Sequence, residues 1–359
     1  MKQGFLTKLL VITSAVAIII SAYLIQASLT KTAKDSLSQS LTRVLNATQQ
    51  SLSSWQHQEK NTVTLSANDS GILPAIEALL ELKRVKGNLI GHSSQNFLRK
   101  HFKPLLEAKE YEGYFIIGPD GVNLSSTRNE NIGVTNLLST QKNILYKIFS
   151  GKIIISLPQK TDVPLSDTRK DGKNTKATMF SGAPIRDKND KVIAALVFRI
   201  NPYKDFTRII NNGRIGISGE TYGFNRDSKL ISESRFEEQL HELNLISPSS
   251  RSILNVEIVN PNLSGSSPPQ KTLMASIATS GESGSNLDGY RDYRGVDVVG
   301  VWIWDPEMNM GLASEMDLGE AYYSLNISVI SIWLVALLAI ITIVVLSVKL
   351  KRKVAHEKH

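Results

Sequence analysis

The sequence predicts an α+β protein in which two tandem sheet modules follow a long N-terminal helix and two membrane-spanning helices bracket the whole. Three observations lead to this fold class. Uncharged apolar runs lie near both ends of the 359-residue chain. A stretch without glycine or proline follows the first run, as in a long helix. Strand–turn–strand patterns then appear twice, each within a unit of about 100 residues, which is an ordinary domain size.

Composition excludes several classes of site before any motif is considered. The chain has no cysteine, so disulfides, zinc–thiolate sites and thiol nucleophiles are ruled out. The formal net charge is +8. A compact basic group directly follows the second apolar run, where it is typical of a membrane flank, and we expect no nucleic-acid partner. This group comprises Lys349, Lys351, Arg352 and Lys353.

The two apolar runs are each long enough to cross about 30 Å of hydrocarbon as a helix. Basic residues lie outside both runs, which predicts that both ends are cytoplasmic and the region between them extracytoplasmic. Two alternatives remain open, a cleaved signal peptide for the first run and a buried core helix for the second. The expected segments are a cytoplasmic N-terminus at 1–8, spans at 9–30 and 321–348, and a short basic cytoplasmic tail at 349–359.

Residues 31–108 are expected to form a stalk and a helical region. Apolar residues recur near the 3.6-residue helical period from Lys31 to about Val63. A second helical stretch follows, from about Ser70 to His101. The apolar stripe predicts a parallel helix pair in a homodimer; alternatively, it packs on the sheet modules of its own chain. The stripe comprises Leu37, Leu41, Leu45 and Leu52.

The first sheet module is expected at residues 109–202. It opens with "YEGYFIIGPDGVNLSSTR", a strand, a Pro-Asp-Gly turn and a strand. A helical piece, "LLSTQKNILYKIFSG", and an apolar run, "KIIISL", come next. A long polar loop then leads to the strands "TMFSGAPIRD" and "KVIAALVFRI". This order predicts a module with one central antiparallel sheet.

The second sheet module is expected at residues 203–320. It begins with the helix "NPYKDFTRIIN" and the hairpin "GETYGFNRDSKLISESRF". A middle part rich in Ser, Pro and Gly is expected to be looped. The strands "DVVGVWIW" and "MGLASEMD" then close the module around an Asp305-Pro306-Glu307 turn. The two modules therefore repeat an architecture rather than a sequence.

No catalytic constellation is found in the chain. The six histidines are scattered and form no metal-spaced pair within the folded region, and no Gly-x-Ser-x-Gly motif or phosphate loop is present. We therefore expect no catalytic residue, no metal and no cofactor. Instead, the first module is expected to offer an aromatic cleft with a few polar groups, the pattern of a small-molecule site. Its residues would be Tyr114, Ser126 and Arg128 on one face of the hairpin, joined by Tyr146, Phe180 and Ser181; alternatively, Tyr114 and Phe180 are plain core.

The second hairpin ends in a charged triplet, Glu233-Ser234-Arg235. Alternation along a strand would send Glu233 and Arg235 to one face. An unpaired buried charge costs several kcal/mol, so the two are expected to form a structural network with "GYRDYRG", which supplies Tyr290, Arg291 and Tyr293. Two alternatives are that Arg235 binds a ligand carboxylate or phosphate, and that the triplet lies on the surface.

These patterns together resemble the double Cache (dCache) sensor regions of bacterial transmembrane receptors. "GRIGISGETYGFNRDSKLISESRF" and "GYRDYRGVDVVGVWIW…MGLASEMDLGEAY" resemble the membrane-proximal module of that family. "YEGYFIIGPDGVNLSSTR" resembles the opening of the distal module. The resemblance implies two PAS-like Cache modules on a helical stalk, anchored in the inner membrane, with a small ligand in the distal module.

The resemblance also implies an output domain after the second span, where this chain has "KLKRKVAHEKH". Either the chain is the sensor piece of a longer receptor, or it signals through a separate partner protein. The Arg-x-Trp-Tyr-like segment of amino-acid-binding members is missing from "ILYKIFSGKIIISLP". The expected function is therefore a non-enzymatic periplasmic sensor of an unidentified small ligand. The alternatives are a membrane-anchored adaptor that binds another protein and, less favoured, a periplasmic enzyme.

Overall fold

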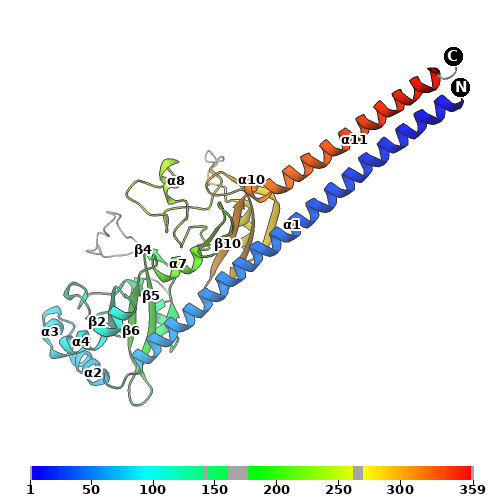
Figure 1. Cartoon of the computed structure of the whole chain (residues 1–359). Helices are drawn as coiled ribbons and strands as arrows, with labels where there is room; N and C mark the ends of the chain where they lie inside the picture. Colours follow the sequence, from blue (N-terminus) through cyan, green and yellow to red (C-terminus); the bar gives the residue numbers. More distant parts are fainter. Residues whose placement is uncertain (1, 141–143, 161–176, 262–269, 357–359) are drawn as a thin grey trace.

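A computed structural model has the predicted α+β fold, with two antiparallel sheets arranged along one long helix (Figure 1). The sheets and shorter helices form a globular part at one end of the molecule, and two long helices lead from it to both termini. The described residues are 2–140, 144–160, 177–261 and 270–356. The fold class predicted from the sequence is confirmed.

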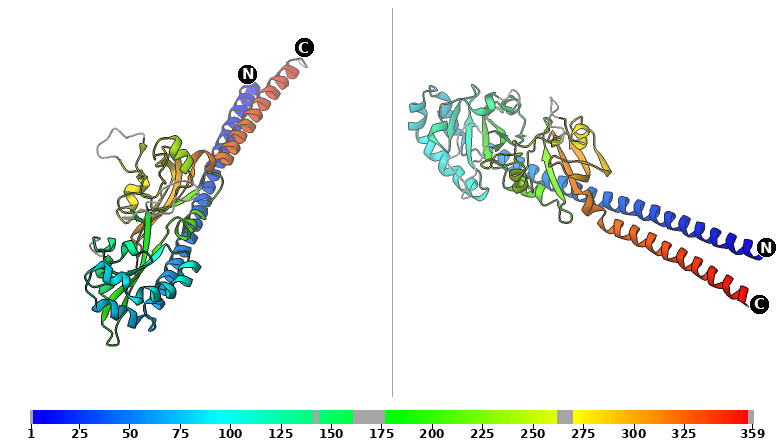
Figure 2. Two further views of the ribbon diagram at one scale, coloured as in Figure 1. Left: turned by 90° about the vertical axis from the view of Figure 1, so that its left-hand side faces the viewer. Right: turned by 90° about the horizontal axis from the view of Figure 1, so that it is seen from above.

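The two apolar runs lie within the two longest helices. Helix α1 runs unbroken from Lys2–Ala67, so the first run and the predicted stalk form one helix of 66 residues. Helix α11 covers Tyr323–His356. Both are long and apolar enough to cross a membrane. They lie side by side up to the termini (Figures 1 and 2), and Trp333 Nε1 donates to Gln26 Oε1 at 2.7 Å.

The second predicted helical stretch is three helices instead of one. The first break lies at Arg84. Its Nη1 donates to the carbonyls of Leu79, Leu80 and Leu82 at 2.8–3.2 Å, and these bonds satisfy the last turn of the first of the three helices. The last of them continues past the predicted end at His101. The three are α2 (Leu73–Glu81), α3 (Lys86–Gly91) and α4 (Ser93–Ala108).

The sheet farther from the two chain termini is here called the distal sheet. It has the strand order β2-β1-β6-β5-β3, with β4 beside β5, and each pairing is antiparallel. Its strands are β1 (Gly113–Ile117), β2 (Asn123–Ser126), β3 (Ile154–Ile155), β4 (Gln159–Lys160), β5 (Ala177–Arg186) and β6 (Val192–Ile200). Short helices η1 (Asn129–Asn131), α5 (Leu137–Thr140) and α6 (Ile144–Phe149) follow β2. Most of the predicted polar loop, residues 161–176, lies outside the described residues.

Both faces of the distal sheet are packed. The inner face, which carries Ile116 and Phe198, contacts the end of α1 together with α2 and α4. The outer face, which carries Phe115 and Val197, contacts α5, α6 and β3. Burial on both faces explains why β1 and β6 read as nearly continuous apolar runs.

The sheet nearer the apolar helices, here called the proximal sheet, has the order β7-β10-β9-β8. The predicted strands β9 and β10 are confirmed, whereas β8 and α9 were missed because they lie in or beside the Ser- and Gly-rich part of the sequence. The elements are α7 (Asp205–Asn211), β7 (Glu220–Phe224), α8 (Glu237–Glu242), α9 (Leu273–Ala278), β8 (Gly284–Arg291), β9 (Asp297–Asp305), β10 (Met310–Asp317) and α10 (Leu318–Ala321).

The segment after β7 departs from the prediction, because it is not the second strand of a hairpin. Leu230 forms an isolated bridge with Phe224, and the chain then leaves the sheet. Gly223 N–H donates to Ser232 Oγ at 2.9 Å, and Ser234 N–H donates to Ser252 Oγ at 2.8 Å. Serine hydroxyls thus take the place of strand carbonyls as partners of the backbone.

The apolar stripe of α1 is buried against both sheets of its own chain. Its residues share one apolar cluster with side chains from the distal sheet and from the proximal sheet. The stripe is therefore not available to a partner helix, and the predicted homodimer contact through it is wrong; a homodimer by another surface stays a prediction. The cluster includes Leu41, Leu45, Leu52 and Trp55 of α1, Met179 and Ile200 of the distal sheet, and Val301, Met310 and Leu312 of the proximal sheet.

Shortening one side chain of this stripe should destabilise the whole globular part. Leu45 is 1 % exposed, and a Leu→Ala change at such a site leaves a cavity that costs about 2–5 kcal/mol. Leu45→Ala should therefore lower the melting temperature of the full chain in detergent. Asn46→Ala, at the exposed neighbouring position, is the control and should leave it nearly unchanged. Equal melting of the two variants would contradict this packing.

Candidate functional site

The candidate ligand residues of the first hairpin do not share one face. Phe115 lies opposite Ser126 in the pairing of β1 with β2, so Ser126 is on the outer face and Tyr114 on the inner face. The Tyr114 hydroxyl lies 3.0 Å from Ser125 Oγ, and its ring lies 4.7 Å from that of Phe102 on α4. The expectation is wrong because the register pairs odd with even residue numbers. Residues of equal parity on the two strands then point to opposite faces.

The other expected ligand residues are also divided. Ser181 is on the inner face, where its hydroxyl donates to the Glu59 carbonyl of α1 at 3.4 Å. Phe180 is on the outer face, with its ring centroid 6.3 Å from that of Phe115. Tyr146 does not line either face, because α6 buries Leu145 and Ile148 and leaves Tyr146 74 % exposed. Arg128 is half-buried, and its backbone N–H donates to Ser126 Oγ at 3.4 Å.

A buried arginine on the outer face was missed by the sequence analysis. Arg199, near the end of β6, is 3 % exposed, and its Nε donates to Thr178 Oγ1 at 3.0 Å. Its guanidinium lies 5.9 Å from the Phe180 ring centroid, and Nε lies 3.9 Å from Glu112 Oε2. Because Arg199 alternates in step with the buried Val197 along an apolar strand, the sequence could have predicted that Arg199 is buried on the same face. The outer face therefore combines aromatic rings, hydroxyls and a buried cation.

The proximal sheet holds two buried carboxylates opposite each other. Glu220 of β7 and Glu315 of β10 are directly paired residues on neighbouring strands, and each is at most 4 % exposed. Glu220 accepts from Ser234 Oγ at 3.0 Å and from Tyr293 OH at 2.6 Å. Glu315 accepts from Tyr290 OH at 2.6 Å. The tyrosines of the predicted network thus bond to these acids.

Burial shifts the acids of this cluster toward their neutral forms. Removal from water, reinforced by the nearby Asp292 and Glu220 carboxylates, raises the pKa of Glu315 to about 8, although the Tyr290 hydrogen bond opposes the shift. The pKa of Glu220 is also raised by burial, against the hydrogen bonds from Tyr293 and Arg235. Near neutral pH the pair therefore retains a bound proton, chiefly on Glu315.

Arg294 supplies a buried positive charge at the edge of this cluster. Its Nε lies 2.6 Å from Asp292 Oδ2, and its Nη2 lies 2.7 Å from Asp317 Oδ1 at the end of β10. Burial alone would lower the pKa of Arg294, but the Asp292 carboxylate keeps it raised. Its guanidinium also lies 3.9 Å from the Phe236 ring centroid.

The charged triplet has the opposite orientation to the one expected. Ser234 is the buried member, whereas Glu233 and Arg235 are half-buried. Glu233 forms an ion pair with Arg251, and the Arg235 guanidinium donates to the Gly219 carbonyl. The predicted inward orientation and mutual pairing of Glu233 and Arg235 are therefore wrong, since the segment is not a strand and each side chain has another partner.

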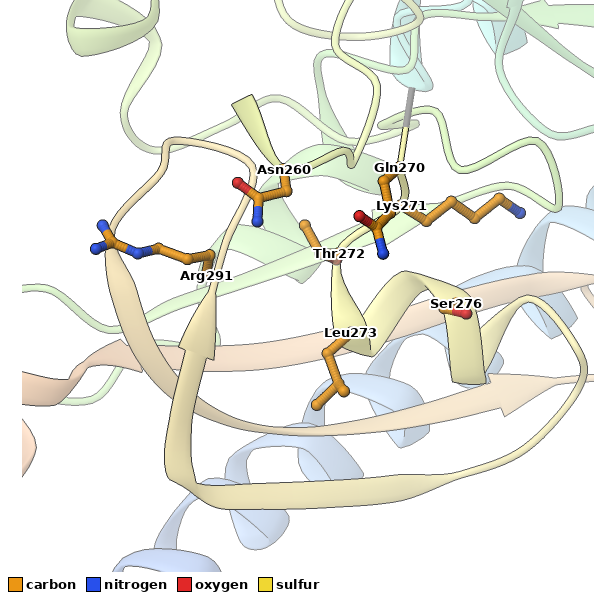
Figure 3. A pocket seen from close by; sticks show the side chains of 7 residues that line it. All are labelled: Asn260, Gln270, Lys271, Thr272, Leu273, Ser276 and Arg291. Carbon is orange, nitrogen blue, oxygen red and sulfur yellow. The ribbon is translucent and has the colours of Figure 1, made fainter. Parts of the chain in front are cut away.

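Arg291, the remaining member of the predicted network, lies at the surface. It lines a shallow pocket of about 450 Å³ beside α9, where its side chain and that of Lys271 extend in opposite directions (Figure 3). Its Nε pairs with Asp297 Oδ1 at 2.9 Å, and both side chains are about half exposed. The buried cation of this region is therefore Arg294 and not Arg291.

A carboxylate ties the start of the second apolar helix to the proximal module. Glu320 of α10 accepts from Ile217 N–H and Ser218 N–H, each at 2.7 Å, and from the Ser218 hydroxyl. These bonds hold the pKa of Glu320 below its usual value. A Cβ at Gly216 would lie 2.3 Å from Glu320 Oε1, and Gly216 has φ +64°, so this turn requires glycine.

Comparison with known proteins finds likeness in structure and not in sequence. No family model and no curated protein matches the chain. The sensor domain of the Vibrio cholerae histidine kinase DctB is 11 % identical, with TM-score 0.47, covering 80 % of this chain and 98 % of that chain. The ligand-binding domain of the Campylobacter jejuni chemoreceptor Tlp3, in complex with L-norvaline, is 12 % identical, with TM-score 0.49, covering 81 % and 94 %. At these values no ligand or activity carries over to this chain.

Removal of the buried arginine should destabilise the protein far more than removal of its exposed neighbour. Arg294→Ala leaves Asp292 buried without its ion-pair partner, which costs about 3–5 kcal/mol. Arg291→Ala removes a half-exposed pair worth less than about 1 kcal/mol. Thermal unfolding of the full chain in detergent should rank the two in this order. A larger loss for Arg291→Ala would mean that the network is centred on the surface pair.

Proposed function

We propose that this chain is a two-pass sensor of the bacterial inner membrane, whose extracytoplasmic modules bind a small ligand and pass the signal to an output domain or partner in the cytoplasm. One observation carries the proposal. Both apolar helices are joined to the sheets without a flexible linker, since α1 continues along both sheets and β10 leads through α10 into α11. A change in either sheet can therefore move one membrane helix relative to the other.

The outer face of the distal sheet is the proposed ligand site. It carries two aromatic rings, the hydroxyls of Ser126 and Thr178, and the buried Arg199, a mixture of apolar surface and few polar groups that suits a small ligand. On the inner face, Tyr114 and Ser181 bond instead to Ser125 and to the stalk helix α1. The sheet itself thus separates a binding face from a face that holds the stalk.

Two neighbouring serines allow this assignment to be tested. Ser126 lies on the outer face and Ser125 on the inner face, and both are at most 1 % exposed. A panel of small carboxylates, amines and amino acids is first screened for compounds that raise the melting temperature of the full chain in nanodiscs. A ligand at 100 times its Kd should stabilise the protein by about 2.7 kcal/mol. Ser126→Ala should reduce that stabilisation, because it removes a hydroxyl from the site.

Ser125→Ala serves as the matched control. It should lower the melting temperature without ligand, because Ser125 Oγ bonds to Tyr114 and Gln95, and it should retain the ligand shift. The reverse pattern would move the site to the inner face. A panel in which no compound stabilises the protein would favour the alternative of a protein-binding adaptor.

The proposed topology has its own test. Basic residues at Lys8 and at Lys349 and Lys351 flank the two apolar segments on their outer sides. A reporter enzyme that is active only outside the cytoplasm should therefore be silent when fused after His359. The same reporter inserted at Glu282, in an exposed turn before β8, should be active. Activity of the terminal fusion would show that one segment does not span the membrane.

A further inference from the structure

The two opposed carboxylates of the proximal sheet are not explained by ligand binding in the distal sheet. Glu220 and Glu315 are held on neighbouring strands, and both are buried. Arg294 is paired with Asp292 and Asp317, and its charge lowers the pKa of Glu220 less than burial raises it. Two like charges in this position would repel each other across the strand pair. Neutralisation of one of them by a bound proton removes that repulsion.

Groups from every surrounding element face this pair. Tyr222 lies on the same side of β7, Tyr290 comes from β8, and the turn after β8 supplies Asp292, Tyr293 and Arg294. Ser234 bonds to Glu220 from the segment after β7, and Arg235 contributes its backbone N–H there. Asp317, two residues beyond Glu315 on β10, is already paired with Arg294. In this set three acids, Glu220, Asp292 and Glu315, are buried, and one arginine, Arg294, is buried with them.

The space around the pair lets neighbouring side chains donate hydrogen bonds to the two carboxyl groups. Gly300 of β9 lies beside Glu315, and a Cβ there would meet Tyr290 OH at 2.5 Å and Glu315 Cγ at 2.8 Å. The absence of a side chain at this position lets Tyr290 reach the carboxyl group. Among the described residues, no group of three or more acidic or histidine side chains is arranged to hold a metal ion.

We propose that the Glu220–Glu315 pair is a proton-binding site, and that loss of its proton at alkaline pH loosens β7 from β10 next to the start of α10. Glu315 lies five residues before Glu320 along the chain, so strain in β10 is delivered to the hydrogen bonds that hold α10. The proximal module would then respond to external pH independently of any ligand in the distal module. Proton binding at this pair does not depend on the proposed sensor function, and can be tested without it.

The direction of the pH dependence follows from the shift of Glu315. Its pKa is raised in the folded protein, to about 8, so the folded state binds this proton more tightly than the unfolded state does. The stability contributed by the bound proton is fully present below the unfolded pKa of about 4.3, and it is lost as pH rises through about 8. The raised pKa of Glu220 acts in the same direction. The phenols of this cluster have pKa values raised well above 10 and stay neutral throughout.

The test measures thermal unfolding of the full chain in nanodiscs between about pH 5 and pH 9, the range over which the stability linked to this proton is lost. Wild-type protein should lose melting temperature toward alkaline pH. Glu315→Gln, which keeps the shape but cannot ionise, should lose less, so that its advantage over wild type grows with pH. Glu282→Gln, at an exposed position, is the control and should follow wild type. A Glu315→Gln profile parallel to that of the control would overturn the proposal.

A second variant distinguishes proton binding from a purely structural role. Tyr290→Phe removes the hydroxyl that stabilises the ionised form of Glu315, so the alkaline loss of stability should move to higher pH. A merely structural hydrogen bond would lower the melting temperature by the same amount at each pH. If Glu315→Gln does not fold, infrared difference spectra of wild type and Tyr290→Phe measure the protonation of Glu315 directly. The protonated-carboxyl band should disappear at higher pH in the variant, and an unchanged midpoint would count against the site.

Discussion

The packing of one apolar stripe of α1 against both sheets is the constraint on which the rest of the structure depends. A helix of 66 residues is about 100 Å long at 1.5 Å per residue. Its first part is apolar all round and suited to lipid, whereas its second part buries Leu41, Leu45, Leu52 and Trp55 in the protein. Because both sheets share this one cluster with the helix, neither can shift along α1 without losing apolar burial. The helix therefore fixes the position of each sheet relative to the apolar N-terminal part of α1.

The second long apolar helix, α11, is held in a different way, by hydrogen bonds at its start rather than by a long apolar stripe. Glu320 receives two backbone N–H groups and a hydroxyl at the start of α10, and Tyr322 OH donates to the Leu287 carbonyl at 2.6 Å. Hydrogen bonds to a charged acceptor are strong but depend on geometry. A small displacement of β10 can break them while the packing of α1 persists. The molecule thus combines one helix held by apolar packing with one held at its start by directional hydrogen bonds.

Periodicity in the sequence was sufficient to predict α1, the first hairpin, the strands β5, β6, β9 and β10, and the apolar helix α11. It was not sufficient to predict which residues meet. The error at Tyr114 and Ser126 arose because the register of a hairpin depends on how its turn and bulge are built, and one residue of slip reverses every face. The error at Glu233 and Arg235 arose because serine hydroxyls replaced strand pairing. Strand β8 escaped notice because "GSNLDGYR" alternates weakly and pairs with an irregular register.

The buried acids show where sequence reasoning reaches its limit. Alternation with Ala313 could have placed Glu315 inward, but its partner Glu220 is 95 positions away and is brought opposite by the register of β7 with β10. Replacing buried polar groups with apolar residues of similar volume is often neutral or stabilising. Stability alone therefore does not explain two carboxylates and three tyrosines in the core of this sheet. Glu315 lies on the strand that leads into α10, so a protonation change there would have a short path to the second long apolar helix.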